Sequence, residues 1–184
     1  MTFIYERPPN NDFAAAAEFE TQVAEKLGSE RLTLVGNHSS TTKFDIVNPG
    51  WILDVKEKRK PYGKMFLRFV PAEWPERNVF ILDELAIRRG LWHDSVSSFF
   101  LIRDVPAERL FFTSVMEVAM MDRVRVNRRT SERTSKGKWL VNLEHMRQVG
   151  NVSECLEVIQ DFEFNKPYHK SPCMSWAGLV PDVS

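Results

Sequence analysis

Cysteine is scarce in this chain. The 184-residue sequence contains only Cys155 and Cys173. Two cysteines make no disulfide framework, and the absence of a C-x-x-C pair argues against a zinc site. We therefore expect two free thiols, which is typical of proteins in the reducing cytoplasm.

Long apolar segments are also missing. No run approaches the roughly 18 apolar residues that a membrane-spanning helix needs. Residues 1–11 lack the basic-then-apolar order of a signal peptide. These features predict a soluble cytoplasmic protein. Its length fits one domain, which we place at residues 1–164, followed by a loosely packed tail at residues 165–184 that is rich in proline and turn residues.

Neither sign of charge dominates. The sequence has 25 basic and 25 acidic residues, so its formal net charge is zero. This balance excludes a protein that coats DNA through overall positive charge, although a local basic surface remains compatible with it.

The most informative stretch is residues 43–56, which predicts two strands joined by a turn at Pro49 and Gly50. Alternation along the second strand places Leu53 and Val55 on one face, with Trp51. Asp54 and Lys56 share the other face, with Ile52 and Lys58. One face therefore belongs to a core, and the other carries charge.

Two carboxylates meet in this hairpin. With Pro49 and Gly50 at the centre of the turn, Asp45 lies opposite Asp54, and their Cβ atoms are about 5 Å apart. At that separation two charges repel by roughly 3 kcal/mol at an effective dielectric constant near 20. A shared proton, a cationic partner such as Lys56, or a metal ion would relieve the repulsion. A register shifted by one residue would leave the two carboxylates either as diagonal neighbours or on opposite faces, and only the first outcome keeps a site.

A third carboxylate comes from a helix predicted at residues 13–27, which ends at Gly28. Glu20 falls within the apolar stripe of this helix, whereas Glu18 and Glu25 point the other way. A carboxylate on the buried side of a helix is costly unless it is paired or binds a metal. Glu20 is therefore either a third acid of the site or a salt-bridge partner of Lys56.

The rest of the chain predicts alternating strands and helices. We expect strands at residues 32–35, 97–103, 110–115 and 139–143, and helices at residues 82–92, 115–121, 144–148 and 153–159. Residues 123–138 hold seven Lys or Arg against one Glu, and we predict a mobile basic loop there. Such a loop is either an ordinary solvent-exposed surface loop or a segment that holds the phosphate backbone of a nucleic acid. The basic residues expected to contact nucleic acid are Lys58, Arg59, Lys60, Arg125, Arg128, Arg129 and Arg133.

The order of these elements resembles the core of the PD-(D/E)XK nuclease superfamily, the restriction-endonuclease-like fold. Glu20 resembles the glutamate of its first helix, Asp45 after Phe44 its first aspartate, and Asp54-Val55-Lys56 its (D/E)-x-K motif. Phe44 stands where the family pattern has proline. The resemblance covers residues 13–103 and implies an α/β fold, in which a central mixed β-sheet is flanked by helices in the order α-β-β-β-α-β, with C-terminal additions.

The resemblance implies metal-dependent hydrolysis of phosphodiester bonds in DNA. Asp45, Asp54 and the carbonyl of Val55 would hold Mg²⁺ or Mn²⁺, with Glu20 as a ligand directly or through water. Lys56 would orient or deprotonate the attacking water. Junction-resolving enzymes and many restriction enzymes of this fold work as dimers, so the resemblance adds a homodimer to the expectations.

Two alternatives remain from the sequence. The same fold can serve as a catalytically inactive module that binds nucleic acid or another protein. A carboxylate-metal hydrolase of another fold would need histidine ligands, and none of the four histidines lies near these acids at a metal-binding spacing.

Overall fold

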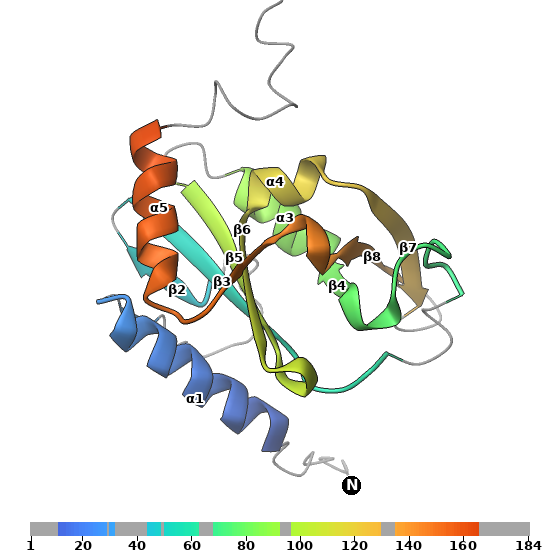
Figure 1. The fold of residues 1–184 in the computed structure, drawn as a ribbon, viewed down its shortest axis with the longest axis horizontal. Coiled ribbons are helices and arrows are strands. Elements are labelled where there is room, and N and C mark those ends of the chain that lie inside the picture. Colours follow the sequence, from blue (N-terminus) through green and yellow to red (C-terminus); the bar gives the residue numbers. More distant parts are fainter. Residues whose placement is uncertain are drawn as a thin grey trace, which may run out of the picture.

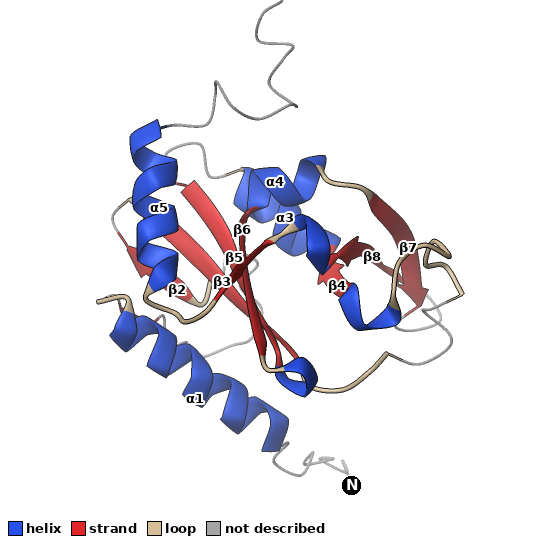
Figure 2. Cartoon of the chain, in the orientation of Figure 1, coloured by secondary structure: helices blue, strands red, loops and turns tan. Residues whose placement is uncertain are grey.

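The computed structural model describes residues 11–28, 30–31, 44–48, 50–62, 68–92, 97–129 and 135–165. Within these residues the chain forms an α/β fold with a central mixed sheet flanked by helices and a second, smaller sheet (Figures 1 and 2). The predicted strand at residues 32–35 and the tail beyond residue 165 lie outside the described residues.

The central sheet has the strand order β1-β2-β3-β5-β6-β9. Its strands are β1 (Glu30–Arg31), β2 (Ile46–Asn48), β3 (Trp51–Lys58), β5 (Ser97–Asp104), β6 (Arg109–Ser114) and β9 (Arg147–Val149). β3 and β5 pair in parallel, and the other neighbours pair antiparallel. The second sheet has the order β4-β8-β7 and consists of β4 (Val79–Asp83), β8 (Ser135–Asn142) and β7 (Arg123–Arg129).

Helices cover both faces of the central sheet. The described helices are α1 (Asn11–Lys26), α3 (Glu84–Leu91), α4 (Val115–Met120) and α5 (Glu154–Asn165), with short 3-10 turns at Glu76–Asn78, Val105–Ala107 and Leu143–His145. α1 and α5 pack on the face that presents Leu53 and Phe99. α3, α4 and the second sheet pack on the face that presents Phe100 and Ile102 (Figure 1).

The strand predicted at residues 97–103 is confirmed as β5. Its four apolar residues are all buried, because Phe99 and Leu101 face one core while Phe100 and Ile102 face the other. A continuous apolar run is the pattern of a strand covered on both faces. The strand and helix predicted within residues 110–121 are also confirmed, as β6 and α4.

The helix predicted at residues 13–27 is confirmed as α1, and its apolar side faces the core as predicted. α1 ends just before Gly28, which has a positive φ of 60° that favours glycine. Phe19 and Val23 are buried against the central sheet, whereas Glu18 is exposed. Glu20 is partly buried, on the side of the helix that the sequence predicted.

The second predicted helix begins later than expected. α3 starts at Glu84 because Leu82 and Asp83 belong to β4, which pairs with β8 of the second sheet. Gly90 allows α3 to lie close to α4, since a Cβ atom at this position would approach the side chain of Val115 to 2.7 Å. The helix predicted at residues 153–159 is confirmed as part of α5.

The prediction of a mobile loop at residues 123–138 is wrong for the described residues. β7 and β8 pair antiparallel there, from Arg123 opposite Val141 to Arg129 opposite Ser135. Val124 and Val126 pack with Leu140 of the second sheet, so the alternation of valine with arginine marks a strand. The helical turn predicted at residues 144–148 is instead the 3-10 turn Leu143–His145 followed by β9.

Candidate active site

The β2–β3 hairpin has the predicted register. Ile46 pairs with Leu53, and Asn48 pairs with Trp51. The alternation of faces is confirmed as well, because Leu53 and Val55 lie in the core beneath α1 and α5. Asp54 therefore points to the opposite face of the sheet.

The hairpin departs from the prediction at Asp45, which is not paired directly with Asp54. Its N–H donates to the carbonyl oxygen of Leu53 at 3.1 Å, so that Asp45 and Ile46 both lie against Leu53. Two residues against one is the arrangement of a β-bulge, which turns a side chain away from its regular direction. The carboxylate of Asp45 reaches along the edge of β3, where its Oδ2 accepts the N–H of Val55 at 2.7 Å.

The edge of β3 beyond Leu53 is where the candidate site forms. The pairing with β2 covers only Trp51, Ile52 and Leu53, while β5 pairs with the other edge of β3 along its whole length. In an antiparallel ladder the N–H and the carbonyl of one residue point to the same neighbour. The carbonyl of Val55 therefore faces the same edge as its N–H, beside Asp45.

Three oxygen groups surround the ammonium of Lys56. Its Nζ forms an ion pair with Asp54 Oδ1 and lies 3.2 Å from the carbonyl oxygen of Val55 and 3.7 Å from Asp45 Oδ2. These are the three groups that the sequence predicted as metal ligands. They already converge on one cation, and hard oxygen donors of this kind suit Mg²⁺ or Mn²⁺.

Glu20 of α1 acts on the same cluster through its charge. Its negative charge is one of the causes that raise the pKa of Lys56. Within the described residues, however, no group of three acidic, histidine or cysteine side chains is close enough to hold a metal jointly. The structure therefore supplies two carboxylates and one carbonyl around Lys56 Nζ, and the charge of Glu20 acts on the same ammonium.

Burial and neighbouring charges set the protonation states of Asp54 and Lys56. Burial raises the pKa of Asp54 to about 7, Lys56 opposes this rise, and Asp45 adds to it. Burial would lower the pKa of Lys56, but the charges of Asp54 and Asp45, with a smaller contribution from Glu20, raise it above the ordinary value. Lys56 is therefore an ammonium at neutral pH, and Asp54 titrates near neutrality.

Lys58 does not have the nucleic-acid contact that was predicted for it. Its side chain is buried, and its ammonium donates to the carbonyl oxygens of Arg77 at 2.9 Å and Val79 at 3.2 Å. These bonds hold the 3-10 turn Glu76–Asn78 and the start of β4 against β3. The prediction was wrong because carbonyl groups some 20 residues later in the chain enclose this lysine.

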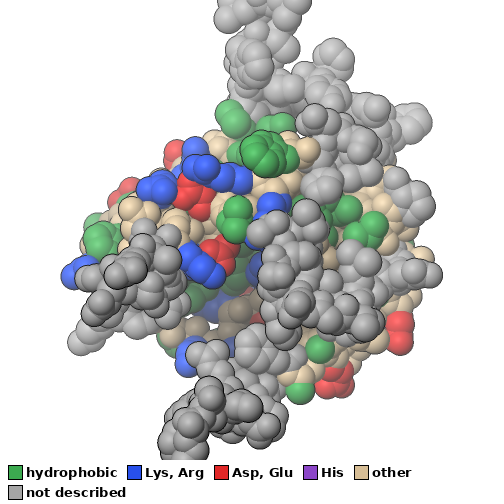
Figure 3. Space-filling view, turned by 180° about the vertical axis from the view of Figure 1, so that it is seen from behind, with side chains coloured by type: hydrophobic (Ala, Val, Ile, Leu, Met, Phe, Trp, Pro, Cys, Tyr) green, Lys and Arg blue, Asp and Glu red, His purple; other side chains and the backbone are tan. Residues whose placement is uncertain are grey.

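The structure describes the side chains of three of the other basic residues predicted to contact nucleic acid. Lys60 is exposed, whereas Arg59 pairs with Glu57 and Arg125 pairs with Glu84 at 2.8 Å. Arg128 and Arg129 belong to β7, but the described structure does not include their side chains, and Arg133 lies outside it. On the face seen in Figure 3, the described Lys and Arg side chains lie among Asp and Glu rather than forming one basic surface.

One charged residue that packs against α1 was not predicted from the sequence. Arg103 stands near the end of β5, where it lies over the ring of Phe19 and contacts Glu57. The only signal in the sequence is a charged residue that closes a run of four apolar ones.

No family model matches the chain, and comparison with curated proteins and with solved structures finds no significant match. Among the helices of the described part of the chain, none has the length and apolar character needed to cross a membrane.

Proposed function

We propose that this protein is a metal-dependent nuclease of the PD-(D/E)XK type that hydrolyses phosphodiester bonds in DNA. The observation that carries the proposal is the position of Lys56 Nζ, which lies among Asp54 Oδ1, Asp45 Oδ2 and the Val55 carbonyl on the edge of β3 that faces β2. A single cation position bounded by two carboxylates and a carbonyl is what a hydrolytic Mg²⁺ site requires.

The topology supports the proposal. The chain runs from α1 through three antiparallel strands to a crossover with α3, and it returns as β5 parallel to β3. This is the α-β-β-β-α-β order implied by the resemblance. The described structure adds β4 within the crossover, and this strand belongs to the second sheet rather than to the central one.

Each residue of the site has a task that follows from its surroundings. Asp45, Asp54 and the Val55 carbonyl would hold Mg²⁺ or Mn²⁺, which when bound would polarise the phosphodiester and offset its charge. The ammonium of Lys56 would orient the attacking water and stabilise the charge that develops on the phosphate. Its raised pKa favours this role over that of a base. Glu20 would keep Lys56 in place through its charge or bind the ion through water.

A second candidate is a catalytically inactive module on the same fold that binds nucleic acid or another protein. One observation favours it: Lys56 already forms ion pairs with both aspartates, and no third acid completes a metal-binding group among the described residues. The two candidates differ in whether the protein cleaves DNA when a divalent cation is present.

The deciding experiment is incubation of the purified protein with plasmid, linear, single-stranded and four-way-junction DNA in Mg²⁺, Mn²⁺ or EDTA. We expect cleavage of at least one substrate with either cation and none in EDTA. Asp54→Asn, prepared in the same way, should be inactive. DNA binding without cleavage of any substrate would instead identify the inactive module.

The glutamates of α1 provide a matched comparison. Glu20→Gln should lower the rate of DNA cleavage by about 10- to 100-fold, because groups that position an active-site residue have effects of this size. Glu18→Gln should change the rate less than about twofold, since Glu18 is exposed and its partner is the amide of Gln22. Cleavage rates at saturating Mg²⁺ measure both, and a larger effect at Glu18 would show that the other face of α1 serves the site.

The pKa of Asp54 predicts how cation binding depends on pH. Below about pH 7 the buried carboxyl holds a proton that a cation must displace. The affinity for Mn²⁺ should therefore rise about tenfold per pH unit as the pH approaches 7, and level off above it. Calorimetric titration with Mn²⁺ from pH 5.5 to 8.5 tests this, and Asp54→Asn should remove the pH-dependent part. An affinity that is independent of pH in the wild type would contradict Asp54 as a ligand.

A further inference from the structure

A cavity of about 520 Å³ lies at the carboxyl ends of the parallel strands β3 and β5. Crevices at the carboxyl ends of parallel strands are frequent ligand sites, and this volume falls within the usual range for them. The cavity is lined by Lys58 and Pro61 at the end of β3 and just beyond it, Pro75, Glu76 and Arg77 at the 3-10 turn before β4, and Asp104, Pro106 and Ala107 at the end of β5.

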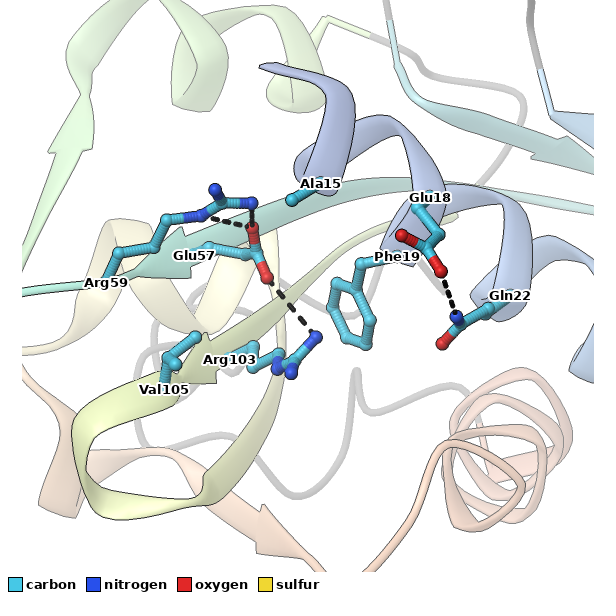
Figure 4. A pocket seen from close by; sticks show the side chains of 8 residues that line it. All are labelled: Ala15, Glu18, Phe19, Gln22, Glu57, Arg59, Arg103 and Val105. Carbon is cyan, nitrogen blue, oxygen red and sulfur yellow. Dashed lines mark hydrogen bonds and ion pairs between the residues drawn. The ribbon is translucent and has the colours of Figure 1, made fainter. Parts of the chain in front are cut away.

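This cavity lies on the same face of the central sheet as the candidate active site. Side chains alternate along a strand, so Lys58 shares the face of Lys56, and two residues of a strand are about 6.6 Å apart. Asp104 lies opposite Lys58 in the parallel register of β5. Glu57 and Arg59 point to the other face, where they line a separate cavity beside α1 (Figure 4).

The charged residues that line this cavity balance each other. Glu76 and Asp104 carry carboxylates, and Lys58 and Arg77 carry cationic groups. The three donors of the Lys58 ammonium are already engaged, because they reach the carbonyl oxygens of Arg77 at 2.9 Å, Val79 at 3.2 Å and Glu76 at 3.5 Å. A phosphate would gain no net attraction from such a lining, so the cavity fits a neutral group.

The walls of the cavity are apolar, and its floor offers a hydrogen-bond acceptor. The exposed apolar residues of the lining are Pro61, Pro75, Pro106 and Ala107. Their burial against the flat face of a ligand would be favourable. Asp104 is buried at the floor, and Arg109 Nη2 takes one of its oxygens, Oδ2, at 2.7 Å. A carboxylate has about four acceptor sites and no donor when ionised. The cavity therefore suits a flat, neutral group with an N–H donor on its edge.

We infer that this cavity binds a base of the DNA strand that is attacked at Asp54 and Lys56, and that it prefers a base with an amino group. A nucleobase is flat and neutral, and aspartate or glutamate accepts from the amino group of cytosine in protein–DNA complexes. Uracil has the same ring as cytosine but carries a carbonyl oxygen in place of this amino group. The inference rests on the proposed nuclease function and adds to it a preference for the base near the cleaved bond.

The first test compares two fluorescent single-stranded homopolymers of equal length, one of deoxycytidine and one of deoxyuridine, in EDTA, where no cleavage is expected. The wild type should bind the cytosine strand about tenfold more tightly, the usual size of discrimination by one base contact. Ala107→Phe should place a ring in the cavity and bring the ratio of the two Kd values to about one, because Ala107 is an exposed lining residue. Ala15→Phe, at the separate cavity of Figure 4, is the matched control and should keep the wild-type ratio.

The second test joins the base to the cleaved bond. In Mg²⁺, a strand of thymidines with a single cytosine should be cut at a constant distance from the cytosine, and Ala107→Phe should lose this preference. Equal Kd values of the wild type for the two homopolymers, or a ratio that Ala107→Phe leaves unchanged, would overturn the inference. So would an equal loss of the ratio in Ala15→Phe. Free cytidine that binds as tightly as the cytosine strand would also overturn it, in favour of a nucleoside ligand.

The two proposals can fail separately. Metal-dependent cleavage by the wild type without a preference for cytosine would remove the base site and leave the nuclease. A preference that Ala107→Phe abolishes, without metal-dependent cleavage of any substrate, would keep the base site and remove the nuclease. Thermal unfolding of each variant shows whether it is folded, and Ala107→Leu carries the test if Ala107→Phe is not.

Discussion

Lys56→Met should reduce the rate of DNA cleavage by about 10²- to 10⁴-fold, the usual range for loss of a group that assists proton transfer or charge stabilisation. Methionine keeps much of the apolar stem of lysine but removes the ammonium that lies among Asp54, Asp45 and the Val55 carbonyl. Lys26→Met, at an exposed lysine of α1, provides the control and should cleave at the wild-type rate. Single-turnover cleavage at saturating Mg²⁺ measures the difference.

The same variant should bind Mn²⁺ more tightly than the wild type. The ammonium and a divalent ion share the same oxygen atoms, so removal of the ammonium leaves these oxygens to the ion. Tighter binding combined with lost cleavage would separate the catalytic task of Lys56 from that of the ligands. Weaker Mn²⁺ binding, or unchanged cleavage, would contradict the site as described.

Asp104→Asn should lower the free energy of unfolding by about 3 to 5 kcal/mol, as expected when one partner is removed from a buried ion pair. Asp104 is 1% exposed, and its Oδ2 lies 2.7 Å from Arg109 Nη2. Lys58 lies near the same carboxylate: burial lowers the pKa of Lys58, and Asp104 opposes that shift. Without the charge of Asp104, the cations of Arg109 and Lys58 would remain beneath the end of β5, and only the smaller effect of Glu76 would oppose the charge of Lys58.

Asp83→Asn is the matched control for this substitution. Asp83 forms an ion pair of the same length, 2.7 Å, with Lys138, but its side chain is 42% exposed. An exposed pair contributes less than about 1 kcal/mol. Urea denaturation of both variants gives the comparison, and similar losses in the two would show that burial does not govern the contribution of Asp104.

Local patterns predicted the elements that build the candidate site. The hairpin register followed from its alternation and turn, and the facing of Glu20 followed from the spacing of apolar residues in α1. β5 followed from four consecutive apolar residues. Each of these signals lies within a short window of sequence, because neighbouring residues alone decide which side chains share a face.

The features that sequence did not predict depend on distant partners. β4 pairs with β8, which lies more than fifty residues later in the chain. The residues around β4 in the sequence do not indicate which strand it pairs with. Lys58 and Lys60 look equivalent in the sequence, but the carbonyls of Arg77 and Val79 enclose only the first. The contact of Arg103 with Phe19 joins the end of β5 to α1, so it exists only after the sheet and the helix have packed.

The bulge at Asp45 makes this region sensitive to changes in chain length. The carboxylate oxygen takes the place of the backbone carbonyl that a continued β2 would offer to Val55. A deletion before Ile46 could restore the regular ladder between β2 and β3. Main-chain atoms of β2 would then occupy the edge of β3 at Val55, and the carboxylate of Asp45 would no longer lie close to Lys56. We therefore expect that, in related chains, the number of residues between Asp45 and the turn at Pro49 and Gly50 varies less than the identity of the side chains around Asp45.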